Sequence, residues 1–152
     1  MITIKEQCSD LIIQPLTMDQ VLSLSFVDYD YYCNDIKAFL DVIRYCVDTT
    51  KINLDETATI TKLLIQIFNI SFYPDKIINT IFLNNLQSIF SKKDKTVEDI
   101  AKLTEFYNLF RYDVLTLMNS RYELSALSKM SLVDIGSMHF NDFINSRTYH
   151  NA

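Results

Sequence analysis

The segment NDIKAFLDVIRYCVD, residues 34–48, carries apolar side chains at the spacing of an amphipathic helix. They recur at intervals of three and four residues, which one face of a helix brings together: Ile36, Phe39, Leu40, Ile43 and Val47. Asn34 or Asp35 can accept hydrogen bonds from the free N–H groups of the first turn. The segment therefore predicts a helix that buries one side.

Five further segments repeat this helical spacing along the rest of the chain. They begin near Asp55, Pro74, Thr96, Asp113 and Ser131. Proline suits the first position of a helix, so the third helix of the chain is predicted to start at Pro74, and the pair Asn84-Asn85 can divide it. In the segment from Asp113, four side chains are predicted to face inward: Val114, Leu117, Met118 and Tyr122.

The segment from Ser131 predicts one helix with Gly136, Phe140, Phe143 and Ile144 on its inner face. A glycine in the middle of a helix costs about 1 kcal/mol relative to alanine. Close approach of a neighbouring helix would account for Gly136, and we expect such a contact.

Residues 1–33 have a less regular pattern. Ile2–Ile4 and Leu11–Ile13 predict short extended pieces. Thr17-Met18-Asp19-Gln20 has the pattern of a capping box and can begin a short helix. We expect residues 1–33 to form an N-terminal arm, or short strands and a helix, and residues 34–148 to form an all-helical domain.

Glycine and proline are scarce, because the 152 residues include one glycine and two prolines. Turns with positive φ and phosphate-binding loops require glycine, so barrels, sandwiches and dinucleotide-binding folds are disfavoured. Hydrophobic residues make up 49% of the chain, which is enough for a substantial core. The fold class predicted is all-α, a compact bundle of six to seven helices.

The net charge of −5 disfavours binding to nucleic acid, whose phosphates repel an acidic protein. Lys92, Lys93 and Lys95 form the only basic cluster, and they lie in a polar break that predicts a solvated loop. No stretch approaches the ~20 apolar residues of a membrane span. Since the N-terminus also lacks the pattern of a signal peptide, we expect a cytoplasmic protein.

Chemistry-bearing residues form no recognisable motif. Cys8, Cys33 and Cys46 have no close pairs, so neither a disulfide framework nor a metal site is expected, and Cys46 is predicted to be a buried structural thiol. His139 has Asp142 three residues away, a spacing that is common on helix surfaces. We expect no enzyme and no cofactor.

Two groups of residues are candidate contacts for a protein partner. Tyr29, Tyr31 and Tyr32 form an aromatic cluster that suits an interface, although Tyr31 or Tyr32 can instead staple the entry to the following helix. A broad apolar surface is carried mainly by the segment from Pro74, which packs centrally in the bundle or leaves a groove open. The residues proposed to line such a groove are Leu63, Ile67, Ile78, Phe82, Leu86 and Phe106.

The chain resembles the Bcl-2-like proteins of poxviruses in three respects. The order and lengths of the predicted helices from Asn34 to Arg147 are similar to that domain. Leu86–Val97 is similar to the loop before the central helix in one branch of the family, and Asn108–Val114 resembles the start of the Bcl-2 homology 1 motif. Leu115–Met118 departs from the family, because it replaces the Asn-Trp-Gly-Arg core and with it the arginine that pairs with a partner's death motif.

The resemblance implies a viral, intracellular antagonist of host defence that acts by binding. Its partners would be host proteins of innate immune signalling, in the NF-κB or interferon pathways, or of apoptosis, and such proteins often form homodimers. The alternative is a structural or scaffolding helical bundle, such as an accessory subunit of a virion or phage, that acts by self-assembly.

Overall fold

A computed structural model describes residues 2–6, 9–26, 37–73 and 75–151 of the chain. Two strands, β1 (Ile2–Glu6) and β2 (Ser9–Ile13), form an antiparallel hairpin in which Ile2 pairs with Ile13. The helices that follow are α1 (Met18–Phe26), α3 (Lys37–Cys46), the 3-10 helix η1 (Thr49–Lys51), α4 (Thr57–Phe72), α5 (Thr80–Ser91), α6 (Val97–Leu109), α7 (Val114–Ser128), α8 (Leu132–Ser137) and α9 (Phe140–Asn151). The predicted helical class is confirmed, with a short hairpin added to it.

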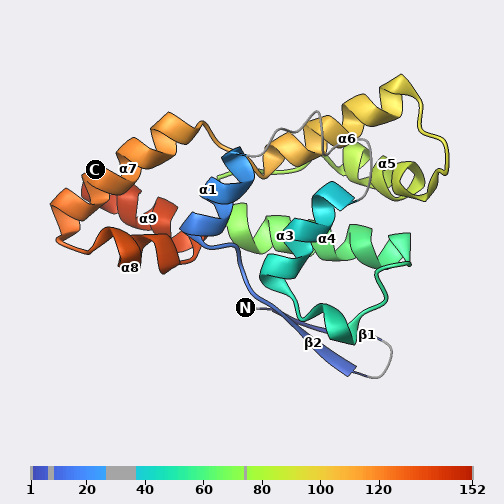
Figure 1. Cartoon of the computed structure of the whole chain (residues 1–152), viewed down its shortest axis with the longest axis horizontal. Helices are drawn as coiled ribbons and strands as arrows, with labels where there is room; N and C mark the ends of the chain where they lie inside the picture. Colours follow the sequence, from blue (N-terminus) through green and yellow to red (C-terminus); the bar gives the residue numbers. More distant parts are fainter. Residues whose placement is uncertain (1, 7–8, 27–36, 74, 152) are drawn as a thin grey trace.

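Helix α4 runs through the middle of the molecule, where it contacts α3, α5 and α9 (Figure 1). Helices α1, α7, α8 and α9 gather at one end, and α5 and α6 lie at the other. The buried side chains of α4 include Ile60, Leu64 and Phe68, which recur at the predicted helical spacing. This helix is thus the central element on which both ends pack.

Aromatic rings join the two ends of the core. Phe72 of α4 lies 5.9 Å from Phe110, which follows α6, and 5.6 Å from Phe140 of α9 (ring centres). Phe39 of α3 stacks on Phe106 of α6 at 5.4 Å. Such ring pairs contribute about 0.5–1.5 kcal/mol each beyond the area that they bury. The aromatic residues therefore connect helices that are distant in sequence.

The N-terminal segment is part of this core. Its buried side chains belong to the same cluster as those of the later helices: Leu11, Ile13, Leu16, Met18, Val21 and Leu24. The backbone N–H of Leu16 also donates to the Ser71 hydroxyl of α4 at 2.9 Å. Of the forms expected for residues 1–33, the structure shows strands and a helix, and the core spans the boundary drawn at residue 33.

Two predicted capping boxes are confirmed. Thr96 and Asp99 exchange hydrogen bonds of 3.0 and 3.1 Å at the start of α6. Thr17 and Gln20 exchange bonds of 2.9 and 3.2 Å at the start of α1. Each pair satisfies two N–H groups that a helix leaves free at its N-terminus, which explains why both helices begin where the sequence indicates.

The predicted start of α5 at Pro74 is wrong. The helix begins at Thr80, because the Asn79 side chain accepts a hydrogen bond of 2.8 Å from the N–H of Ile81 and caps it. Pro74 itself lies outside the described residues. The predicted division at Asn84-Asn85 is also absent, since α5 continues without a break to Ser91.

The segment from Ser131 forms two helices instead of the single one predicted. Between them, His139 pairs with Thr17 in a short antiparallel bridge. The N–H of Phe140 donates to the carbonyl of Leu16 at 2.7 Å, and that of Met18 donates to the carbonyl of Met138 at 2.9 Å. These bonds to a distant segment replace those that a continuous helix would make.

The close approach expected at Gly136 is confirmed. A Cβ atom at this position would collide with the carboxylate of Asp19 on α1. Helices α1 and α8 are in contact, and the absence of a Cβ at Gly136 leaves room between them for the Asp19 side chain.

Candidate protein-binding surface

The residues predicted to line a groove lie in the core between α4, α5 and α6. Five of them are buried: Leu63, Ile67, Ile78, Leu86 and Phe106. Phe82 is half-buried, and its ring centre lies 6.1 Å from that of Phe106. The structure brings these residues together in the core, where the surrounding helices leave five of the six side chains almost without solvent exposure. A partner would reach them only if the core opened, and their role in binding stays a prediction.

The second predicted contact was the aromatic cluster of Tyr29, Tyr31 and Tyr32. All three lie within residues 27–36, outside the part of the chain that the structure describes. Their role in binding also stays a prediction.

Apolar side chains are exposed where α4 ends and α5 begins. We call Tyr73, Ile77 and Ile81 the α4–α5 patch, and 72% of the surface of each isoleucine is accessible to solvent. Helix α5 buries Leu86, Ile89 and Phe90 on one face, and the helical period of 3.6 residues places Ile81 on the opposite face. The broad apolar character of this segment is therefore divided between the core and the surface.

Lys76, which lies between Tyr73 and Ile77 in the chain, holds the end of α6. Its Nζ donates hydrogen bonds of 2.9 Å to the carbonyls of Leu109 and Arg111. The same nitrogen lies 3.7 Å from the centre of the Tyr112 ring and 5.5 Å from that of Phe72. The last carbonyls of a helix have no partner within the helix, so the lysine supplies what α6 lacks.

The protonation of Lys76 depends on this environment. Burial lowers the pKa of the Lys76 ammonium from 10.5 to about 8, and the nearby Asp75 carboxylate opposes that shift. Asp75 also accepts a hydrogen bond of 2.6 Å from the Tyr112 hydroxyl. The two charged side chains of the turn after α4, Asp75 and Lys76, thus both bond to the connection between α6 and α7.

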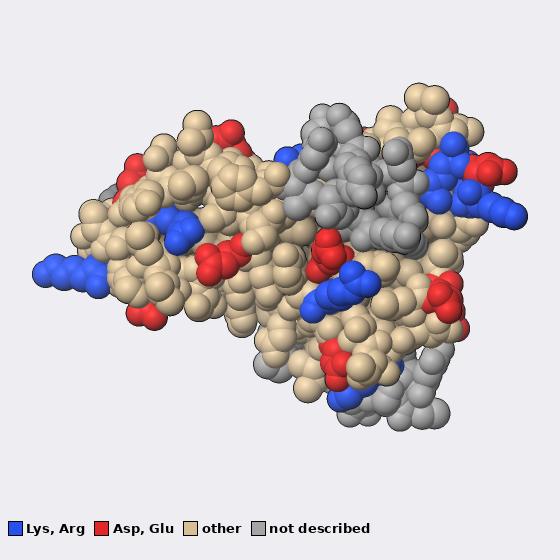
Figure 2. Space-filling model, in the orientation of Figure 1, with Lys and Arg blue, Asp and Glu red and all other residues tan. Residues whose placement is uncertain are grey.

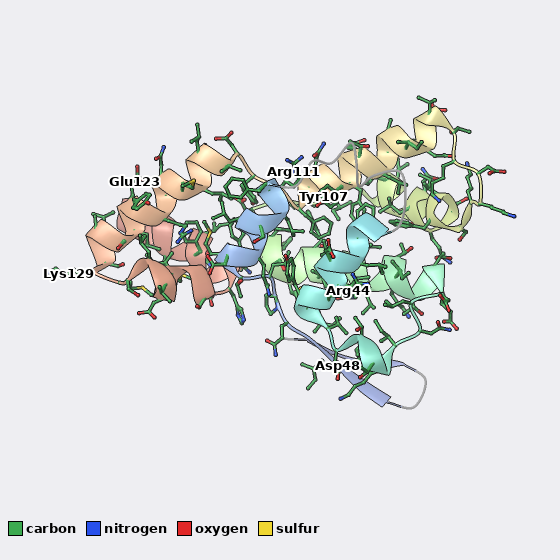
Figure 3. All side chains as sticks on the ribbon, viewed as in Figure 1. Arg44, Asp48, Tyr107, Arg111, Glu123 and Lys129 are labelled. Carbon is green, nitrogen blue, oxygen red and sulfur yellow. The ribbon has the colours of Figure 1, made fainter. Side chains whose placement is uncertain are left out.

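Arg111 fixes the same connection to α1. Its Nη2 donates to the carbonyl of Ser25 at 2.9 Å, and the N–H of Tyr112 donates to the Ser25 hydroxyl at 3.0 Å. Figure 3 shows Arg111 at the C-terminal end of α1, where α6 gives way to α7. The α4–α5 patch therefore stands on a junction of several helices, and such support favours a surface of fixed shape.

Helix α7 exposes apolar side chains as well. It buries Leu117 and Leu124, whereas Leu115 is 71% and Tyr122 is 58% exposed. The prediction that Leu117 faces inward is confirmed, and that for Tyr122 is wrong. The error arises because α7 carries apolar residues on two opposite faces, so periodicity alone does not say which face is covered.

On the face drawn in Figure 2, the charged side chains of the described residues form no single cluster. Figure 2 shows them scattered over the visible face in small groups of both signs. Lys92, from the predicted loop between α5 and α6, pairs with Asp99 at 3.0 Å. The hydrogen bond from the Thr96 backbone, together with this pair, holds the pKa of the Asp99 carboxyl below its usual value.

One surface hollow, of about 450 Å³, lies between α4 and α5, and its lining includes the polar side chains of Thr59, Lys62 and Gln87. Another, of about 380 Å³, lies between β2 and the end of α3. Within the described ranges, no three His, Cys, Asp or Glu side chains come together as metal ligands would.

Cys46 is buried, as predicted, and burial raises the pKa of its thiol to about 12. A thiol with such a pKa stays protonated at neutral pH and is a poor nucleophile. No helix in the described parts of the chain has the length and apolar character to cross a membrane.

Comparison with models of protein families, with curated proteins and with solved structures gives no match. The assignment of a function therefore depends on the chain's own residues and geometry.

Proposed function

We propose that this protein acts without catalysis, by binding host proteins of innate immune signalling or of apoptosis and blocking their contacts. The resemblance of residues 34–147 to poxvirus Bcl-2-like proteins supports this class of partner. The observation that carries the proposal is the α4–α5 patch, which exposes Tyr73, Ile77 and Ile81 on a surface held by the Lys76 junction.

The energy available from this patch is substantial. Burial of one exposed isoleucine side chain contributes about 1.5–3 kcal/mol, and Ile77 and Ile81 are both largely exposed. A tyrosine beside them adds apolar area and a hydroxyl that can form a hydrogen bond, a combination common in interfaces. The patch therefore suits the apolar face of a partner helix or sheet.

Binding at the surface is favoured over binding in a central groove. The cluster that includes Leu63, Leu86 and Phe106 is closed, so a groove would require separation of packed helices. The sequence also has Leu115–Met118 where the Bcl-2 family has the arginine that pairs with a death motif. Both observations favour signalling proteins over death-motif helices as partners.

The proposal is tested in cells that express the protein, with reporters of NF-κB and interferon signalling and an assay of induced cell death. The wild type should suppress at least one response, and the Ile77→Asp/Ile81→Asp variant should not. Val97→Asp is the control, because Val97 is a branched side chain outside the patch that is even more exposed than Ile77 and Ile81. It should suppress as the wild type does.

Two results would contradict the proposal. Lack of suppression by the wild type in every assay would exclude the host-antagonist function. Full suppression by the Ile77→Asp/Ile81→Asp variant would exclude the α4–α5 patch as the contact surface. Circular dichroism of each purified variant establishes that the helices are intact.

The alternative function is a structural protein that assembles with itself. Its specific support is that apolar side chains are exposed on two separate surfaces, the α4–α5 patch and the outer face of α7. Two different adhesive surfaces on one subunit can build an open assembly. Light scattering of the purified protein distinguishes this function, because a scaffold would form species much larger than a dimer.

A further inference from the structure

The hollow of about 380 Å³ beside β2 lies along an edge of that strand. Leu11 and Ile12 both line it, although neighbouring residues of a strand point to opposite faces. Strand β1 pairs with β2 over the whole length of the strand and so occupies one edge. No other strand in the described part of the chain joins this pair. The hollow therefore borders the edge of β2 whose N–H and C=O groups no strand uses.

Apolar groups form much of the lining. Leu11 and Val47 are buried there, whereas Ile12 is 50% and Tyr45 is 40% exposed. An exposed aliphatic side chain and an aromatic ring at one site favour an apolar group of a ligand. Leu11–Ile13 also contains no proline and no charged residue, two of the devices that usually protect the edge of a sheet from another chain.

The charge of the lining is positive, although the net charge of the chain is −5. Arg44 and Lys51 contribute two cations, and Asp48 contributes one carboxylate. That carboxylate already accepts hydrogen bonds of 2.7 and 3.1 Å from the hydroxyl and the N–H of Thr50. Arg44 makes a longer contact of 3.4 Å with Asp41, and both of these side chains are exposed. An anionic group in the hollow is therefore attracted by two cations.

We propose that this hollow binds an extended, acidic segment of a partner protein, which adds to the hairpin as a third strand along β2. The inference goes beyond the proposed function, because it uses a surface other than the α4–α5 patch. Backbone groups of β2 hold the main chain of the segment. An apolar side chain of the segment lies against Ile12 and Tyr45, and an acidic one faces Arg44 and Lys51. Strand addition combines main-chain hydrogen bonds, which give affinity, with side-chain contacts, which give specificity.

A second copy of the chain is a poorer occupant of this edge. A two-fold contact uses the same surface of both copies. Pairing of β2 with β2 would therefore bring Arg44 and Lys51 of one copy toward the same two cations of the other. Like charges that face each other in an interface oppose association, whereas an acidic segment removes this repulsion.

Peptides selected on the protein test the proposal. The probe is a phage-displayed library of random peptides, and the immobilised wild type should enrich peptides that are rich in Asp and Glu and contain an apolar residue. The Arg44→Gln/Lys51→Gln variant should bind a synthetic copy of the best peptide about tenfold more weakly, because charge-assisted hydrogen bonds are lost. The Lys93→Gln/Lys129→Gln variant is the control, since it removes two exposed cations outside the hollow. It should bind as the wild type does.

N-methylation of the selected peptide tests strand addition without a change in the protein. In an extended chain, alternate N–H groups point to the same side, so only one alternate set can donate to β2. Methylation of that set should weaken binding at least tenfold, and methylation of the other set should leave binding unchanged.

Three results would overturn the proposal. The first is enrichment of neutral or basic peptides only, or of none. The second is equal binding of the best peptide to the wild type and to Arg44→Gln/Lys51→Gln, with circular dichroism showing that both are folded. The third is an equal effect of the two methylated sets. Loss of peptide binding in Ile77→Asp/Ile81→Asp would instead place the peptide on the α4–α5 patch, and it too would contradict the assignment to β2.

Discussion

The Nζ of Lys76 lies 3.7 Å from the centre of the Tyr112 ring while it donates hydrogen bonds to the carbonyls of Leu109 and Arg111. A cation over an aromatic face is stabilised by the negative charge of the ring surface. This contact joins the turn after α4 to the α6–α7 connection and supports the α4–α5 patch.

The pH dependence of stability should report on this amine. The folded-state pKa of Lys76 is about 8, below the ordinary lysine value of 10.5. Between these two pH values the unfolded chain binds more protons than the folded chain, so the free energy of unfolding rises with pH. Lys76→Met should remove this rise. Urea unfolding at pH 7, 9 and 10.5 measures it, with Lys93→Met in the exposed loop as the control. If the free energy of unfolding of Lys76→Met rises with pH as much as that of the wild type, the amine of Lys76 is not buried as the structure shows.

The close contact of α1 with α8 predicts coupling between two substitutions. In an Asp19→Ala background, Gly136→Ala should raise the free energy of unfolding, because alanine is the better helix former. The gain should be less than the ~1 kcal/mol of a helix interior, since Gly136 is the next-to-last residue of α8. In the wild type the same substitution should gain less or destabilise, because the new Cβ displaces the Asp19 carboxylate. A double-mutant cycle by urea unfolding measures the coupling. Equal effects in both backgrounds would exclude the contact.

The capping box of α6 predicts a loss of stability in acid. The carboxylate of Asp99 accepts hydrogen bonds from Thr96 and Lys92, which lower its folded-state pKa below the ordinary aspartate value of 3.8. Its contribution is present above pH 3.8 and is lost as the pH falls through the lower, folded-state pKa. The difference in stability between the wild type and Asp99→Asn should therefore be constant near neutral pH and shrink in acid. If the stability difference between the wild type and Asp99→Asn does not change with pH, the Asp99 carboxylate does not make the stabilising hydrogen bonds to Thr96 and Lys92.

The residues predicted to line a groove should behave as core residues. Phe106 is fully buried and contacts Phe39, Phe82 and Phe110, so Phe106→Ala should reduce the free energy of unfolding by about 3–5 kcal/mol. Phe26→Ala is the matched control, since Phe26 is exposed, and it should change stability by less than about 0.5 kcal/mol. Similar small effects at both positions would indicate that the groove is open.

The sequence predicts most of the helices because their signals are local. Thr96 and Asp99 are three residues apart, and the apolar stripe of α4 repeats within one segment. The start of α5 is ambiguous in the sequence, because Pro74 in front of the apolar run and Asn79, a good capping residue, are both local start signals. The structure uses Asn79.

The candidate surface was less predictable, because it depends on contacts between distant segments. Lys76 bonds to carbonyls 33 and 35 residues away, and a backbone carbonyl leaves no mark in the sequence. The division between α8 and α9 likewise depends on Leu16 and Met18, more than 100 positions earlier. Which apolar residues of α5 and α7 face solvent is decided by this packing. Leu86 and Phe106 are buried by it, and their role in a groove stays a prediction.

The central claim is that Ile77 and its neighbours contact a host protein. The most direct measurement is photo-crosslinking in host cells with benzoylphenylalanine in place of Ile77, and with the same group in place of Val97 as the control, followed by mass spectrometry. The account predicts a crosslinked protein of innate signalling or apoptosis at position 77 that is absent at position 97. Crosslinks at position 77 to copies of this chain alone, or to the same proteins as at position 97, would contradict it.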